Sequence, residues 1–106
     1  MVKKYHKLVR DKIPRIIEAG GSQCVTRILR DEEYLQFLDE KLQEELAEYQ
    51  QSKEPEELAD LLEVIEAAAV ARGCSWQELL QIKENKKEKR GGFREKILLL
   101  EVTEKE

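Results

Sequence analysis

The sequence has few of the residues that build histidine-, zinc- or thiol-based sites. Its 106 residues contain one histidine, His6, and two isolated cysteines, Cys24 and Cys74. Zinc and dithiol sites normally take their cysteines in closely spaced pairs, and a single histidine excludes a histidine-rich metal site. His6 is expected on the surface. The two cysteines are expected to be buried, reduced thiols of a cytoplasmic protein.

Long hydrophobic runs are also absent. No apolar stretch reaches the roughly 20 residues of a transmembrane helix, and the basic first residues lead into no apolar signal-peptide segment. Apolar residues make up 41% and charged residues 40% of the chain, which is too many core-forming residues for a disordered chain. We therefore expect no membrane partner, and a single helical domain over residues 1–106 with a heavily charged surface.

The charges are unevenly distributed along the chain. Residues 1–15 hold six bases and one acid, residues 39–66 eleven acids and two bases, and residues 81–96 seven bases and three acids. The net charge of −4 argues against a nucleic-acid partner. An acidic middle between basic ends fits a site for a metal cation and a polyphosphate. Alternatively, the same charges pair with each other as surface salt bridges.

Hydrophobic periodicity and helix caps predict an all-α fold with one short and three long helices. The short helix covers residues 15–19, and the long ones cover about 32–51, 56–72 and 76–90. Asp31 is the expected N-cap of the first long helix, and Ser75 with Glu78 is the expected capping box of the last.

Two short apolar runs are candidate strands. Residues 24–29 alternate and are rich in β-branched side chains, so they predict a strand or an extended segment. Residues 97–102 predict either a strand, which would lie beside 24–29, or a docking tail.

Paired acids occur where the helical pattern is otherwise apolar. Glu57 and Asp60 fall inside the apolar arc of the helix over 56–72, and Glu45 and Glu48 form a similar i, i+3 pair on the preceding helix. A four-residue break makes these helices antiparallel neighbours, so the two pairs approach each other. Four half-buried carboxylates would repel each other unless they were protonated or neutralised, and Mg²⁺ with its oxygen ligands is the natural remedy.

An ordinary explanation exists for most of these acids. Acids in the first turn of a helix favour the helix dipole, which accounts for Glu56 and offers an alternative explanation for Glu57, and solvated acid pairs are common on helices. Asp60 lies deeper in the apolar arc and is not explained as well by the dipole.

Three motifs carry a resemblance to a known family. Glu44-Glu45-Leu46-Ala47-Glu48 followed by Glu57-Leu58-Ala59-Asp60 resembles the EExxE…ExxD signature of the all-α nucleoside triphosphate pyrophosphatases, the MazG-like superfamily. The opening Lys7-Leu8-Val9-Arg10-Asp11-Lys12-Ile13-Pro14 resembles the start of its phosphoribosyl-ATP pyrophosphohydrolase-like subgroup, which is described as predicted house-cleaning enzymes. Asn85-Lys86-Lys87-Glu88-Lys89-Arg90 resembles the segment that ends the superfamily's third helix. Only eight residues separate Glu48 from Glu57, fewer than is usual in MazG proteins.

The resemblance implies a helical bundle that assembles as a homodimer or a larger homo-oligomer, with Mg²⁺ as the cofactor and Mn²⁺ as a substitute. By position, the metal ligands would be Glu45, Glu48, Glu57 and Asp60. Glu44 would lie in or beside this group and orient the attacking water. Asn85, Lys87 and Arg90 would contact the triphosphate or the sugar.

Charge alone makes Arg10, Lys12 and Lys83 candidates for phosphate contacts. Arg10 and Lys12 are equally suited to salt bridges that tie the N-terminal segment to the acidic helices. For Lys83 the alternative is the helix dipole, which is the usual reason for a lysine near a helix C-terminus.

The function expected from these features is Mg²⁺-dependent hydrolysis of a nucleoside triphosphate to a monophosphate and pyrophosphate, with modified nucleotides as candidate substrates. Three alternatives stay open. They are phosphoribosyl-ATP as the substrate, a non-catalytic helical oligomer whose acids are structural or bind Mg²⁺, and a partner-binding helical module.

Overall fold

The computed structural model describes residues 1–105 and contains four helices, with no strand in that part of the chain. The helices are α1 (Ile13–Ala19), α2 (Asp31–Ser52), α3 (Pro55–Ala71) and α4 (Trp76–Arg90). The prediction of one short and three long helices is confirmed, and the predicted limits agree with the observed ones to within two residues.

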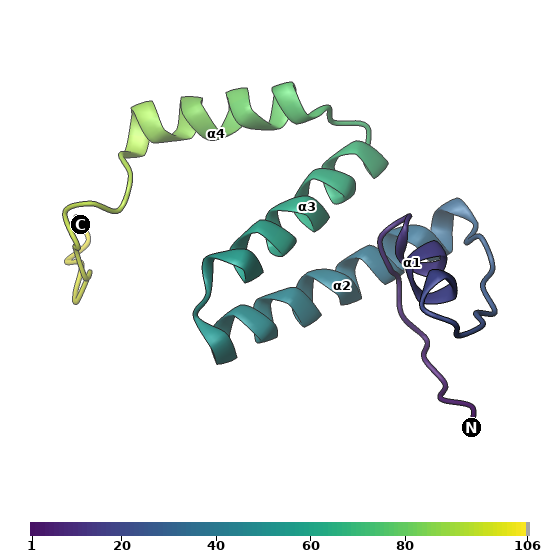
Figure 1. Ribbon diagram of the computed structural model, residues 1–106. Helices are drawn as coiled ribbons and strands as arrows, with labels where there is room; N and C mark the ends of the chain where they lie inside the picture. Colours follow the sequence, from purple (N-terminus) through teal and green to yellow (C-terminus); the bar gives the residue numbers. More distant parts are fainter. Residues whose placement is uncertain (106) are drawn as a thin grey trace.

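Neither candidate segment forms a strand, so the strand alternative is wrong for both. Residues 24–29 and 97–102 are irregular and take part in no β-ladder within the described range. They lie at opposite ends of the molecule, the first in the connection from α1 to α2 and the second beyond α4 (Figure 1). A strand needs a partner for its backbone groups. The chain does not bring these two segments together.

The helix starts follow local capping chemistry. At α4 the Ser75 hydroxyl accepts a hydrogen bond from the Glu78 N–H (3.1 Å), and the Glu78 carboxylate accepts one from the Ser75 N–H (3.2 Å), so this capping box is confirmed. At α2 the N-cap is Arg30 instead of Asp31, which is already the first helical residue. The Arg30 N–H donates to the Glu33 carboxylate at 3.1 Å, so Glu33 satisfies the backbone donor of the N-cap residue.

Helices α2 and α3 form an antiparallel hairpin, as the short break predicts (Figure 1). Lys53 ends α2 in a left-handed conformation (φ 62°), and Pro55 begins α3. Proline is favoured at this position because its missing N–H would have no partner there. Leu38 from α2 and Val64 from α3 are the buried apolar residues of the described chain.

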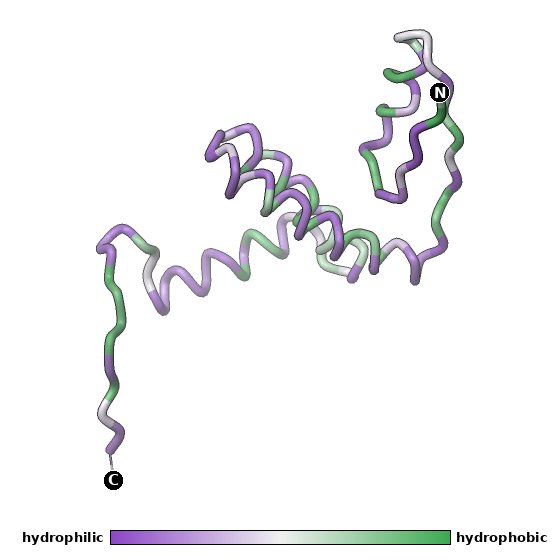
Figure 2. Tube along the Cα trace, turned by 90° about the horizontal axis from the view of Figure 1, so that it is seen from below, coloured by the Kyte–Doolittle hydropathy of each residue, from purple (hydrophilic) through white to green (hydrophobic). Residues whose placement is uncertain are grey.

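Helix α4 leaves the hairpin at an angle and packs against α3 alone among the helices of residues 1–105. Its apolar residues lie in its first half, and the sequence from Lys83 to Arg90 is polar and exposed. The molecule is consequently elongated, with extents of 65 × 31 × 25 Å. Figure 2 shows an apolar stretch in the segment that follows α4, away from the hairpin. None of the four helices has the length and apolar character needed to span a bilayer.

Candidate carboxylate metal site

Three carboxylates converge between α2 and α3. Glu45 of α2 and the pair Glu57 and Asp60 of α3 each offer one oxygen, and these oxygens all lie within 4.8 Å of one another. Oxygens around an octahedral Mg²⁺ lie about 3.0–4.2 Å apart, because each is about 2.1 Å from the ion. Small side-chain rotations would therefore bring the three oxygens to ligand spacing.

Glu45 is the buried member of this group. The residue is 6% exposed, and its Oε2 atom is buried without a hydrogen-bond partner. Burial and, secondly, the neighbouring carboxyl of Glu48 raise the pKa of Glu45, while Lys41 acts in the opposite direction. A buried carboxylate oxygen without a partner is costly, so a proton or a cation at this atom would stabilise the folded chain.

Glu48 lies one turn further along α2 and is exposed. It is close enough to Glu45 to influence its pKa, but it is not one of the three converging carboxylates. The structure thus groups three of the four predicted ligands and leaves Glu48 at the edge of the group.

The N-terminal segment reaches the carboxylates. The Arg10 guanidinium lies 2.7 Å from Asp60 Oδ1. Lys7 lies 3.4 Å from Glu44. The salt-bridge alternative considered for the basic N-terminal segment is therefore present at Arg10. Lys12 is exposed and stands at the N-cap of α1.

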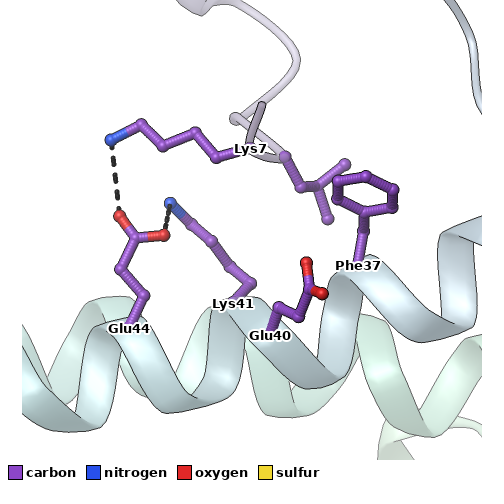
Figure 3. A pocket seen from close by; sticks show the side chains of 6 residues that line it. Lys7, Phe37, Glu40, Lys41 and Glu44 are labelled. Atoms are coloured by element: carbon purple, nitrogen blue, oxygen red, sulfur yellow. Dashed lines mark hydrogen bonds and ion pairs between the residues drawn. The ribbon is translucent and has the colours of Figure 1, made fainter. Parts of the chain in front are cut away.

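Glu44 is held between two lysines instead of pointing into the carboxylate group. Lys7 Nζ lies 3.4 Å from its Oε1 and Lys41 Nζ 3.4 Å from its Oε2. Figure 3 shows both lysines directed at the Glu44 carboxylate, with Phe37 and Glu40 further along the same face of α2. Glu44 is not one of the three converging carboxylates.

The predicted substrate residues of α4 lie elsewhere in the chain. Lys83, Asn85, Lys87 and Arg90 are all exposed. Asn85 accepts a hydrogen bond from Gln81 at 2.9 Å. No helix contact within residues 1–105 brings this half of α4 to the carboxylates.

Lys41 is a site residue that the sequence reasoning missed. Its ammonium lies 3.3 Å from Glu45 Oε1 and 3.4 Å from Glu44 Oε2. The signal was present, because Lys41 is three and four residues before two acids of the motif and such pairs meet on a helix. The contact of Lys7 with Glu44 joins residues 37 positions apart, and no local pattern indicates it.

Comparison with known proteins does not indicate an activity for this chain. No family model matches the chain, and no solved structure matches it. A protein of Mycolicibacterium smegmatis (strain ATCC 700084 / mc(2)155), described as an uncharacterized protein, is 55% identical over 42 residues. The match covers 40% of this chain and 43% of that protein, so the chain spans less than half the length of this relative. Function is therefore argued from the site.

Proposed function

We propose that Glu45, Glu57 and Asp60 hold Mg²⁺, and that the protein hydrolyses nucleoside triphosphates to monophosphate and pyrophosphate. The observation that carries the metal site is the buried, unpartnered Oε2 of Glu45 beside two further carboxylates. The donor set also fits, because Mg²⁺ prefers carboxylate oxygens. Glu48 completes the set from the exposed edge, and Mn²⁺ fits the same oxygens.

The hydrolytic step follows from the charges around this group. Water adds its oxygen to the α-phosphorus, the bond from that phosphorus to the bridging oxygen breaks, and pyrophosphate leaves. Glu44, the residue next to Glu45, is our candidate for orienting this water, and the proton of the water passes to solvent. A bound Mg²⁺ supplies charge neutralisation at the phosphate oxygens. Arg10, Lys12, Lys83, Asn85, Lys87 and Arg90 remain our candidates for contacts with the substrate.

The pyrophosphatase assignment rests on the MazG-like motifs described above, now supported by the convergence of three of their acids. The same superfamily suggests an assembly of two or more copies. Because α4 contacts only α3 among the helices of residues 1–105, we infer that a second copy brings its α4 to these carboxylates. We also propose a cytoplasmic location, in keeping with the two free cysteines, Cys24 and Cys74.

The first experiment measures pyrophosphate release from ordinary and modified nucleoside triphosphates and from phosphoribosyl-ATP, with Mg²⁺ and with EDTA. We expect Mg²⁺-dependent release by the wild type. Asp60→Asn should lower it by on the order of 100-fold or more, because a ligand of the cation loses its charge. The matched control is Asp39→Asn, which removes the same charge from an exposed position on α2.

Each outcome selects one function. Release confined to phosphoribosyl-ATP would redefine the substrate and keep the site. Mg²⁺ binding without any pyrophosphate release would favour the non-catalytic oligomer. Equal activity of Asp60→Asn and the wild type would exclude Asp60 as a ligand. If the protein binds no divalent cation, the partner-binding helical module is the function that remains.

A further inference from the structure

The shortest ion pair at the carboxylate group involves a residue outside the two helices that build the group. Arg10 lies 50 positions before Asp60, and its guanidinium is 2.7 Å from the Asp60 carboxylate. Three residues earlier, Lys7 lies 3.4 Å from Glu44. Residues 7–10 therefore cross from α2 to α3 as a strap that places two positive charges against the acidic motif.

The strap and a metal ion require the same carboxylate. Asp60 is one of the three converging ligands and also the partner of Arg10. A guanidinium at hydrogen-bond distance from one oxygen would lie only a few ångströms from a cation on the other, and like charges at that distance repel. The Arg10 ion pair is also partly exposed, with 55% of its side chain and 41% of that of Asp60 accessible, so it is weak enough to be displaced.

We propose that the strap regulates the carboxylate site, because Arg10 and a divalent cation are alternative partners of Asp60. Cation binding releases Arg10, which frees a guanidinium beside the site for the phosphate groups of a substrate. In the other arrangement Arg10 neutralises Asp60. This inference rests on the proposed metal site.

The ion pair of Arg10 with Asp60 also explains why the sequence suggests two roles for Arg10. Arg10 was a candidate both for phosphate binding and for a salt bridge to the acidic helices. A displaceable ion pair makes the two roles successive states of one side chain. A guanidinium suits both partners, since it binds carboxylates and phosphates in the same forked geometry.

The test compares Mg²⁺ affinity, measured by calorimetric titration, in the wild type, Arg10→Gln and Arg15→Gln. Arg15 is an exposed arginine of α1, so the control removes the same charge nearby. We expect Arg10→Gln to bind Mg²⁺ roughly five-fold more tightly than the wild type, because a competing ion pair is removed. Arg15→Gln should bind as the wild type does.

A second measurement leaves Arg10 in place. Trypsin cleaves after Arg10 only when the guanidinium can enter the protease, so Mg²⁺ should accelerate cleavage after Arg10 several-fold relative to cleavage after Lys4. Asp60→Asn should show no such acceleration. This readout does not depend on the stability of Arg10→Gln.

The outcomes separate the two proposals. A wild type that binds Mg²⁺ through Asp60, with equal or weaker binding by Arg10→Gln and no Mg²⁺ effect on cleavage, would overturn the strap and leave the metal site. A wild type that binds no Mg²⁺ would overturn both. Tighter binding by Arg10→Gln together with faster cleavage supports both.

Discussion

The Glu45 carboxylate lowers the stability of the metal-free folded protein, although the proposed metal site needs it. Its carboxylate is buried between α2 and α3, and one of its oxygens has no partner. Burial raises its pKa above the ordinary value of 4.5. The folded state therefore keeps the proton at a pH where the unfolded chain has lost it, and the folded state loses stability as the pH rises through that interval.

We therefore expect Glu45→Gln to stabilise the metal-free protein while abolishing Mg²⁺ binding. In EDTA at neutral pH the gain should be on the order of 1 kcal/mol, because the buried carboxylate oxygen that Lys41 does not reach is no longer charged. Below about pH 4.5 the difference from the wild type should fade, since Glu45 is then protonated in both states. Thermal unfolding followed by circular dichroism measures both effects.

With Mg²⁺ added, the wild type should become more stable than Glu45→Gln. A ligand that binds only the folded state raises its stability, so the wild type should gain melting temperature and Glu45→Gln should not. Glu63→Gln is the matched control, because Glu63 is an exposed acid of α3. A Glu45→Gln protein that is less stable in EDTA and still stabilised by Mg²⁺ would contradict this account of the site.

At the scale of single elements, the start of α2 depends on one carboxylate. Glu33 accepts hydrogen bonds from both terminal nitrogens of Arg27, at 3.1 and 2.9 Å, and from the Arg30 N–H. The Arg27 hydrogen bond and, secondly, that from Arg30 lower the pKa of Glu33 to about 2. A carboxylate with a lowered pKa stabilises the fold above its ordinary pKa, and this contribution is lost as the pH falls toward the lowered value.

Glu33→Gln should therefore be less stable than the wild type at pH 5–7, and the difference should shrink as the pH falls from about 4.5 toward about 2. Thermal unfolding across this range is the measurement. Glu32→Gln removes the same charge from the same first turn without the Arg27 contact, so it reports the helix dipole alone. If the stability difference between Glu33→Gln and the wild type does not change with pH, the charge of Glu33 does not stabilise the start of α2.

The helices were predictable because the forces that set their limits are local. Ser75 and Glu78 are three residues apart, and so are Glu57 and Asp60, so helical periodicity alone places each pair. The contacts of Lys7 with Glu44 and of Arg10 with Asp60 join residues 37 and 50 positions apart. Charge made these pairings plausible, but only the path of the folded chain selects the partners. The strand prediction for residues 24–29 and 97–102 was wrong for a related reason. A strand is stable only when its backbone pairs with a second strand, and local sequence does not show whether the fold supplies one.

At the scale of the whole molecule, one chain leaves an unusual amount of surface exposed. Its accessible surface is 10293 Å², whereas a compact protein of 12.4 kDa exposes about 6,100 Å². Its radius of gyration is 18.9 Å, against about 13 Å for a compact chain of this length. The excess surface is at least as large as the area that obligate subunits bury per chain, about 1,000–2,500 Å².

We expect the protein in solution to have at least twice the mass of one 12.4 kDa chain, as measured by light scattering after size exclusion. Leu58 and Leu62 lie one turn apart on α3 and are 47% and 51% exposed, so they are suited to a contact with another copy. Leu62→Glu should shift the mass toward one chain, because a charge in an apolar contact leaves water at a cost of a few kcal/mol. Gln36→Glu adds the same charge at an exposed position of α2 and should leave the mass unchanged. A wild type that stays at the mass of one chain at all concentrations would mean that the elongated form is stable alone, and α4 of a second copy could then not complete the site.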